Sequence, residues 1–469
     1  MNYLLSYLTT IVGLIICSIL DLIDNEHLFL YLNIIYNVFI IVLIIRKIKK
    51  GMAIIDPLFI ASIFMFLLPY GFPILFQYTN NSIRYEPNYS YLAQGMLYAN
   101  VGFITLWYSY NSSLFNKSLN RCKKYAWIFV KKLNLNKTLV YIVIILSVVL
   151  NLKSIYNGNY GVLSTIYPES RAYGAFDQLE YLVGTGLKGV VFLQAWQYYK
   201  YKKGKRLFFI SFCVLLLFQI LAGYKGAVVM SFVLLFFANY LAIKKINIRL
   251  GIICLFALFL AYGLVNPYRE YLIYTGDRPA SITSIISCIV NGVVLQSQVI
   301  SNEDVSVIDE IMSRFTSLPE LAEFIEYKTK YGLRIPRDPD FLYLCYTIPA
   351  QLLVPRFLWA SKPVNDLGVW WVSNKVVGNM SNSSSAFGPV GFLYLTFDTI
   401  AIILGYIIIT YLLKLCGLLL HSNRDGAILT GVILLSSLYV NEAGFNTYII
   451  GGIRFLIIGI IFQAIILKR

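Results

Sequence analysis

The residues best suited to chemistry lie in one short segment bounded by prolines, Pro355-Arg356-Phe357-Leu358-Trp359-Ala360-Ser361-Lys362-Pro363. Its prolines and Trp359 confine the charges of Arg356 and Lys362. The planar fork of an arginine can hold two phosphate oxygens at once, and a lysine supplies a compact charge. The face of Trp359 suits either a sugar ring or the bilayer interface. The segment therefore predicts contact with a phosphate or a glycan.

Further cations lie near the ends of apolar segments or within the long polar segment between residues 267 and 387. A cation at headgroup depth can bind phosphate, or it can anchor the chain at the membrane interface. The sequence leaves both roles open for each of them. These candidates are Arg171, Lys225, Arg269, Arg278 and Arg337.

Carboxylates are the available general bases, because both histidines, His27 and His421, lie outside the long polar segment. A carboxylate within an apolar segment is costly unless it is paired. Arg454, inside the last apolar segment, is a candidate partner for such a group, and a purely structural pair of Glu442 with Arg454 is an open alternative. The candidate catalytic carboxylates are Asp338, Asp366 and Asp398.

Two short acidic patterns, Asp24-Asn25-Glu26 and Asp338-Pro339-Asp340, resemble fragments of a metal site. A divalent cation with oxygen ligands needs further ligands, which the sequence does not locate. Solvated turns account for such triplets more simply. We therefore expect neither a metal site nor another cofactor.

The elements that must position these residues are apolar. Hydrophobic residues make up 58% of the 469 residues, and the mean hydropathy is +0.69. We expect an all-α polytopic integral membrane protein with about twelve transmembrane helices, because apolar runs of this length can cross a bilayer. The runs are 4–20, 28–45, 53–75, 92–110, 138–156, 180–199, 207–222, 227–243, 251–266, 388–413, 427–441 and 448–467.

Charge placement predicts the orientation. Six alternate segments, 46–50, 117–137, 200–206, 244–249, 414–424 and 468–469, hold 23 of the 39 Lys and Arg residues. Cytoplasmic loops carry such an excess of Lys and Arg, so both termini are expected in the cytoplasm. The formal net charge of +16 is then mainly a topology signal, and it gives no support to nucleic-acid binding.

This topology divides the chain into three expected regions: a nine-helix membrane region over 1–266, a large external loop over 267–387 and a three-helix membrane region over 388–469. Within the loop, apolar spacing from Ile308 and the capping pattern of Ser317 with Glu320 predict two short amphipathic helices. The apolar stretches 281–300 and 341–359 are interrupted by polar residues and prolines. We expect them to be interfacial or re-entrant, although either could span.

The Pro-Arg-x-x-Trp-x-x-Lys-Pro run is followed by Ser383-Ser384-Ser385-Ala386-Phe387-Gly388-Pro389-Val390-Gly391 at the start of another apolar run. With the architecture, these residues resemble the oligosaccharide repeat-unit polymerases, the Wzy-type O-antigen and capsule polymerases. That family often has an arginine in its Gly-rich external turn. Lys225 in Gly223-Tyr224-Lys225-Gly226 departs from this by keeping the charge and losing the bidentate geometry.

The resemblance implies a metal-independent membrane glycosyltransferase of polysaccharide biosynthesis in the bacterial cell envelope. Its substrates would be undecaprenyl-pyrophosphate-linked oligosaccharides at the external (periplasmic) face of the bacterial cytoplasmic, or inner, membrane. It would transfer the growing glycan from one lipid pyrophosphate to the non-reducing end of another repeat unit, toward O-antigen of lipopolysaccharide or capsule. Membrane lipids, a chain-length regulator and a flippase of the same pathway are the implied partners.

Two alternatives remain. A flippase or another transporter of lipid-linked oligosaccharide would suit twelve spans, but transporters usually have short external loops and some repetition between their halves. An O-antigen ligase would share the topology, although ligases typically carry a functional histidine in the large loop. No histidine occurs between residues 267 and 387.

Overall fold

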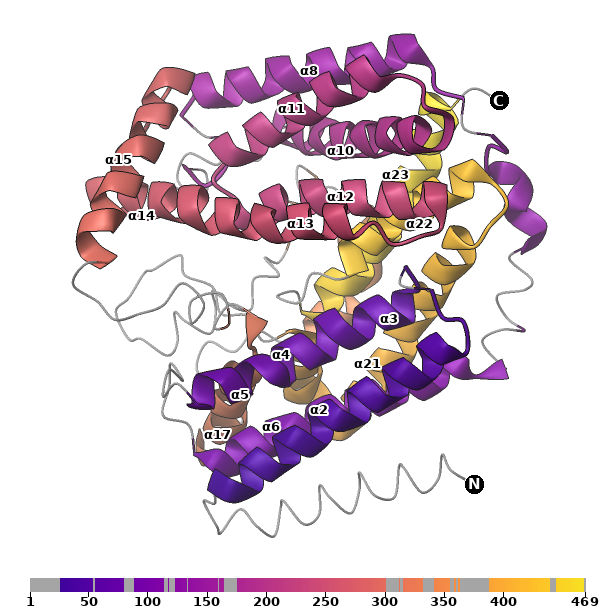
Figure 1. Ribbon diagram of the computed structural model, residues 1–469. Helices are drawn as coiled ribbons and strands as arrows, with labels where there is room; N and C mark the ends of the chain where they lie inside the picture. The colour runs from indigo at the N-terminus through magenta and orange to yellow at the C-terminus, as the bar shows by residue number, and fades with distance from the viewer. Residues whose placement is uncertain are drawn as a thin grey trace. The chain divides into compact units, whose positions relative to one another are not determined.

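The structure is a computed structural model that describes residues 26–53, 55–79, 88–113, 123–132, 134–158, 160–163, 175–300, 315–331, 341–354, 388–438 and 444–467, with the single residues 117, 312, 358, 359 and 362. Over these ranges the chain is helical, with one isolated β-bridge and no strand (Figure 1). The all-α prediction is confirmed there. The chain divides into two compact units, which are described separately below.

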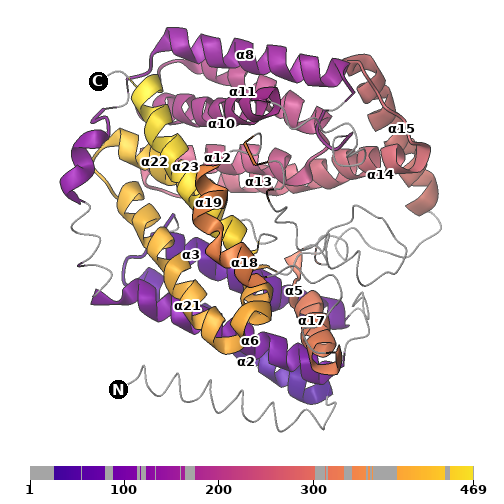
Figure 2. The ribbon, with the colours of Figure 1, turned by 180° about the vertical axis from the view of Figure 1, so that it is seen from behind.

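Unit 1 comprises residues 1–131 and 306–461. Its centre is α6, which packs against α2, α17 and α21 (Figures 1 and 2). Nearly every residue of α6 from Leu92 to Trp107 is buried, so this helix has no wide lipid-facing side. The described helices of unit 1 are α2 (Glu26–Lys49), α3 (Pro57–Ala61), the π-helical η2 (Ser62–Leu67), α4 (Leu68–Tyr70), α5 (Phe72–Thr79), α6 (Tyr89–Asn111), the 3-10 helix η3 (Lys123–Ile128), α17 (Leu318–Tyr331), α18 (Phe341–Tyr346), α19 (Ile348–Leu353), α21 (Gly388–Leu420), α22 (Asp425–Leu438) and most of α23 (Phe445–Ile466).

Buried polar side chains of α2 bond the irregular backbone between α3 and α5. The Tyr36 hydroxyl donates to the Phe66 carbonyl at 3.3 Å, and the Asn33 amide donates to the Tyr70 carbonyl at 3.2 Å. A π-helical turn and a break in a helix leave carbonyls without their usual partners, and such groups must be satisfied away from water. Gly71 is required at the break, because a Cβ there would lie 2.4 Å from Asn37 Oδ1.

Unit 2 comprises residues 132–305 and 462–469. Here α10 packs against α8, α11 and α12, and α14 packs along α15 (Figure 1). Gly292 permits the second contact, because a Cβ there would lie 2.5 Å from the Pro267 carbonyl oxygen. The helices of unit 2 are α8 (Lys137–Tyr156), α10 (Ala175–Tyr201), α11 (Lys205–Leu221), α12 (Lys225–Ile243), α13 (Ile248–Leu260), the π-helical η5 (Ala261–Val265), α14 (Asn266–Thr275) and α15 (Ile282–Ile300), with the last turn of α23.

Among the described residues, six segments are long and apolar enough to cross a membrane, judged by length and composition. They match six of the twelve predicted runs. The runs at 92–110, 180–199, 207–222, 251–266 and 427–441 also coincide with helices, but they do not meet those criteria, and the run at 4–20 lies outside the described residues. The count of twelve and the three-region division remain predictions. The six segments are Phe29–Lys49, Pro57–Thr79, Lys137–Tyr156, Lys225–Ile243, Gly388–Leu420 and Phe445–Ile466.

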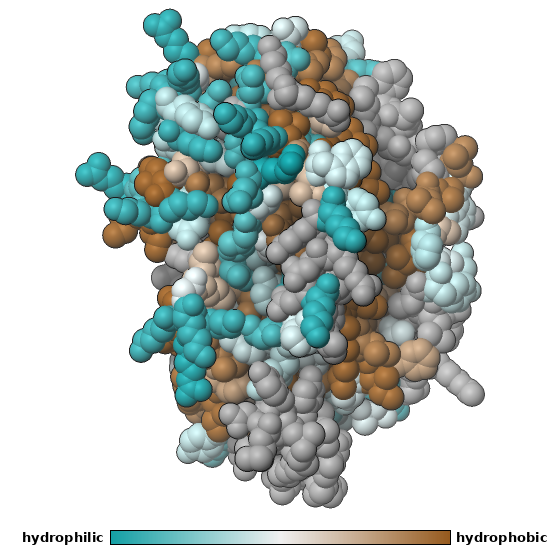
Figure 3. Space-filling model, turned by 90° about the vertical axis from the view of Figure 1, so that its right-hand side faces the viewer, coloured by the Kyte–Doolittle hydropathy of each residue, from teal (hydrophilic) through white to brown (hydrophobic). Residues whose placement is uncertain are grey.

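Several of these helices expose an apolar face. Ile35 of α2, Ile145 of α8 and Phe256 of α13 are each about 60% exposed, and Figure 3 shows hydrophobic side chains at the surface beside groups of hydrophilic ones. Exposed apolar side chains in such number are unfavourable in water and suited to lipid. The chain is therefore a helical membrane protein.

The predicted loop contains ordered helices. The capping pattern at Ser317 and Glu320 correctly predicts α17, which begins at Leu318 with Pro319 in its first turn. Its apolar face, including Leu321 and Phe324, is buried, and the helix packs against α6, so it rests on the bundle. The stretch 281–300 forms α15, and the stretch 341–359 contains α18 and α19.

Candidate functional site

The structure describes six of the eleven predicted site residues. Asp398, Trp359 and Lys362 lie in unit 1, whereas Lys225, Arg269 and Arg278 lie in unit 2. Because each unit is described by itself, the two groups are considered in turn. The other five predicted residues lie outside the described residues: Arg171, Arg337, Asp338, Arg356 and Asp366.

The C-terminal end of α19 brings two cations together. Lys362 Nζ donates to the Gln351 carbonyl at 2.5 Å and to the Val354 carbonyl at 2.7 Å. Arg454 of α23 donates from Nη2 to the same Gln351 oxygen at 2.8 Å. The ammonium of Lys362 and the guanidinium of Arg454 therefore both bond the same carbonyl oxygen. Gln351, Lys362 and Arg454 are called the α19 cation site below.

The local sequence explains why these carbonyls are available. Pro349 is the second residue of α19, and Val354 leaves the helix in an extended conformation, with φ −90° and ψ 115°. The last carbonyls of a helix lack partners inside the helix, and cations are the favoured side chains there. The buried Gln351 side chain fixes the helix from within, because its Nε2 donates to Thr347 Oγ1 at 2.8 Å and to the Leu344 carbonyl at 3.2 Å.

These bonds bring the Lys362 side chain to the Val354 carbonyl, eight positions earlier in the chain. The Lys362 N–H also donates to the Trp359 carbonyl at 3.0 Å, so the tryptophan and the lysine belong to one turn. Lys362 and Trp359 are both partly buried. Arg356 lies between Val354 and Lys362 in the sequence and outside the described residues. The Pro-Arg-x-x-Trp-x-x-Lys-Pro run thus places at least one of its cations beside a second cation from a distant helix.

Two like charges around one oxygen repel each other, and the repulsion grows where water is scarce. An anion with several oxygens, such as a phosphate or pyrophosphate, can accept from both cations and remove the repulsion. The α19 cation site is therefore suited to a phosphorylated ligand.

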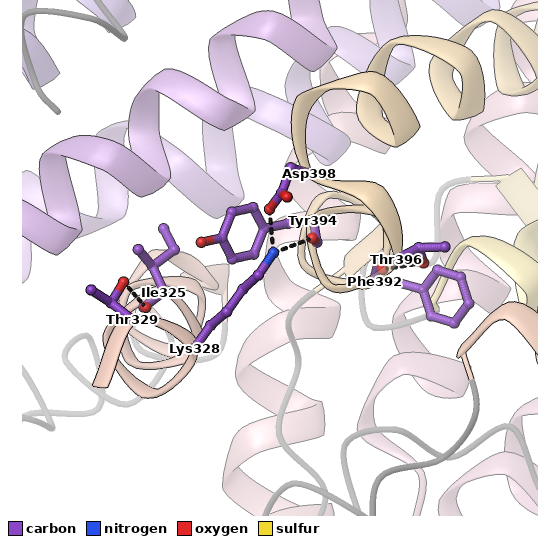
Figure 4. Close-up of polar contacts among 7 residues, drawn as sticks. All are labelled: Ile325, Lys328, Thr329, Phe392, Tyr394, Thr396 and Asp398. Atoms are coloured by element: carbon purple, nitrogen blue, oxygen red, sulfur yellow. Dashed lines mark hydrogen bonds and ion pairs between the residues drawn. The ribbon is translucent and has the colours of Figure 1, made fainter. Parts of the chain in front are cut away.

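Asp398 has a cation partner that the sequence did not suggest. Lys328 of α17 forms an ion pair with Asp398, donates to the Tyr394 carbonyl at 3.3 Å, and lies over the Tyr394 ring at 4.2 Å (Figure 4). Arg454 donates to the Gln351 carbonyl, and its predicted pair with Glu442 stays a prediction, because Glu442 lies outside the described residues. The sequence did not distinguish Lys328 from the other basic residues of the segment 267–387, of which there are ten in all. Its position on a predicted amphipathic helix was the one feature that could have singled it out.

The carboxylate of Asp398 lies at a break in α21. Phe397 has φ −148° and ψ 42°, and Asp398 has φ 49° and ψ −139°, so the helical path is interrupted. A positive φ is rare for residues other than glycine. The break turns the Asp398 side chain toward Lys328 (Figure 4), and 59% of that side chain is exposed.

In unit 2, the turn that carries Lys225 is tightly held. The Val162 N–H donates to the Ala222 carbonyl at 2.8 Å, and the Tyr224 hydroxyl donates to the Gly161 carbonyl at 2.9 Å. Gly223 has φ +74°, and Lys225 is the first residue of α12. Lys225 is thus partly buried on a rigid turn at a helix N-terminus, a position that favours anions.

Arg269 on α14 and Arg278 after it are both exposed. Next to Arg269, Tyr268 is fully buried and packs near Gly223. Burial raises the pKa of the Tyr268 phenol, and its hydroxyl has no hydrogen-bond partner among the described residues. The structure brings no predicted carboxylate to these cations within the part of unit 2 that it describes.

No family model, curated protein or solved structure matches this chain. The fold and the apolar helices define the class of protein as a helical membrane protein.

Proposed function

We propose that this chain is a membrane glycosyltransferase that polymerises undecaprenyl-pyrophosphate-linked oligosaccharide repeat units at the external face of the bacterial cytoplasmic membrane. The observation that carries the proposal is the α19 cation site, in which Lys362 and Arg454 meet at one carbonyl beside Trp359. A pyrophosphate leaving group needs cations of this kind, and a glycan needs an aromatic face close by.

The proposed reaction breaks one bond and forms one. A hydroxyl at the non-reducing end of the acceptor repeat unit attacks the anomeric carbon of the growing glycan. The bond between that carbon and the pyrophosphate oxygen breaks, and the electron pair leaves with the lipid pyrophosphate. Lys362 and Arg454 stabilise the charge that develops on the leaving oxygen. The acceptor proton passes to a carboxylate, and the lipid pyrophosphate is released.

Asp338, Asp366 and Asp398 are the candidates for that base. The ion pair with Lys328 already engages Asp398, and breaking it would be part of any proton transfer to this carboxylate. This favours Asp338 or Asp366 as the base and a positioning role for Asp398. Lys225 and Arg269 are proposed to contact lipid phosphate at the membrane surface.

The rival functions differ in what they leave behind in cells. A flippase moves the lipid-linked unit without lengthening it, and a ligase moves a finished chain to another acceptor. The test is a strain that lacks this gene, complemented with the wild type or with Lys362→Met, whose surface glycan is separated on a gel. Lys330→Met is the matched control, because Lys330 is an exposed lysine of the same segment that pairs with Glu326.

We expect the strain without the gene and the strain complemented with Lys362→Met to show a single repeat unit at the surface and no ladder. The wild type and Lys330→Met should restore the ladder. If no glycan at all reaches the surface of the strain without the gene, the transporter is the better assignment. If long chains accumulate on their lipid carrier, the protein is a ligase.

A further inference from the structure

Lys188 is a cation in an unusual place. It is the central residue of α10, within the apolar run predicted at 180–199, and its neighbours Leu187, Val190 and Val191 are buried. In the part of the chain that the structure describes, Lys188 forms no hydrogen bond and no ion pair. The helices α8 and α12, which pack against α10, both qualify as membrane spans.

An ionised lysine at this depth is costly unless an anion compensates it, and such residues generally face a cavity or a ligand path. The lysine stem is partly buried. No described side chain supplies the negative charge, so an anionic group of a ligand is a candidate to supply it. This distinguishes Lys188 from Lys328, whose carboxylate partner is present.

There is room for an anion one turn away. A Cβ placed on Gly184 would meet no atom within 4 Å, whereas a Cβ on Gly189 would lie 2.7 Å from Phe462. Residues four apart share one face of a helix, and helical side chains lean toward the N-terminus. This rule predicts that the Lys188 side chain extends along the side of α10 on which Gly184 lies.

That direction is toward the external membrane surface in the predicted orientation, because the C-terminal end of α10 leads into the basic turn 200–206. Lys188 lies about 12 Å along the helix from residue 180, at the start of the predicted span. The long lysine side chain can extend toward the membrane surface, so its ammonium lies closer to the headgroups than the Lys188 backbone does. An anionic group that dips slightly below the external headgroups can reach the ammonium.

We infer that Lys188 and the open side of α10 at Gly184 form a binding site for the phosphate group of a lipid that enters unit 2 from the external leaflet. The site does not require the proposed function. If that function holds, the lipid is the undecaprenyl carrier; otherwise an ordinary anionic phospholipid supplies the same phosphate chemistry.

The test measures lipid binding to the full-length protein in neutral detergent by native mass spectrometry. The probes are undecaprenyl phosphate, phosphatidylglycerol and inorganic pyrophosphate. Lys188→Met removes the charge, Lys188→Arg keeps it, and Gly184→Leu fills the open side without touching the charge. Gly251→Leu is the matched control for the last change, because a Cβ on Gly251 also meets nothing within 4 Å. Lys137→Met, at an exposed lysine of α8, controls for loss of a positive charge.

We expect Lys188→Met and Gly184→Leu to weaken binding of a lipid phosphate at least tenfold, and Lys188→Arg and both controls to stay within threefold of the wild type. If Lys188→Met does not fold, Gly184→Leu and its control decide the matter. Preference for undecaprenyl phosphate or for phosphatidylglycerol supports the site and identifies its occupant. Unchanged lipid binding in Gly184→Leu and Lys188→Met, or equal binding of inorganic pyrophosphate, overturns it, whatever the glycan ladder shows.

Discussion

Lys328 and Asp398 form an ion pair that joins α17 of the predicted loop to the break in α21. The two residues are 70 positions apart, and the lysine is largely buried while the aspartate is more than half exposed. The pair therefore links α17, which belongs to the predicted loop, to α21 in the helix bundle of unit 1. Its contribution is limited by water at Asp398, and exposed pairs are worth about 1 kcal/mol or less.

A double-mutant cycle measures this pair. We expect Lys328→Met and Asp398→Asn each to lower the unfolding temperature in detergent by about 1–3 °C, and the double variant to lose no more than the worse single one. Strictly additive losses would contradict a direct interaction. Lys330→Met, which breaks the exposed pair with Glu326, should change the temperature less.

The backbone at Asp398 makes a second prediction. Because its φ of 49° with ψ of −139° is strained for a residue with a Cβ, Asp398→Gly should relieve strain of about 1–3 kcal/mol while it loses the ion pair. In a Lys328→Met background the pair is already lost, so Asp398→Gly should raise the unfolding temperature there. A further fall in that background would mean that the break is not strained.

Gly161 and Gly158 form a matched pair for the turn that holds Lys225. Both have positive φ, +58° and +65°, but a Cβ on Gly161 would lie 2.1 Å from the Ala222 carbonyl, whereas one on Gly158 meets nothing within 4 Å. Gly158→Ala should cost about 1 kcal/mol, the ordinary penalty for a left-handed alanine. Gly161→Ala should cost clearly more, and equal unfolding temperatures for the two variants would refute the close approach.

Tyr268→Phe should leave stability unchanged or raise it. The buried hydroxyl has no partner among the described residues, so the phenol is desolvated without a compensating bond. Removing such a group is nearly neutral or favourable. The measurement is thermal unfolding in detergent, and a loss of more than about 1 kcal/mol would reveal a partner for this hydroxyl.

Local signals in the sequence predicted local structure well. The Ser317 and Glu320 pattern located the start of α17, whereas the division of the stretch 341–359 into α18 and α19 was not predicted. The helical class followed from apolar length alone. The π-helical turn at Ser62–Leu67 was not predicted within the run 53–75, because it depends on the bonds that α2 supplies from a distant part of the chain.

Partners distant in sequence could not be predicted. Lys328 meets Asp398, and Arg454 meets the Gln351 carbonyl 103 positions away, because helix packing decides these contacts. The break at Phe397 contains neither proline nor glycine, so no helix-breaking residue marks it in the sequence. The sequence did single out Lys362 and Trp359 through their prolines, and the structure places them in one turn.

The most direct test of the central claim is glycan transfer by the purified protein. Undecaprenyl-pyrophosphate-linked repeat units are supplied as both donor and acceptor, and chain length and released undecaprenyl pyrophosphate are measured together. We predict that the wild type forms lipid-linked chains of two or more units, with one lipid pyrophosphate released per unit added. Lys362→Met and Arg454→Met should each lower kcat about a hundredfold, and Lys330→Met should not. No lengthening by the wild type, or full activity in both variants, would contradict the account.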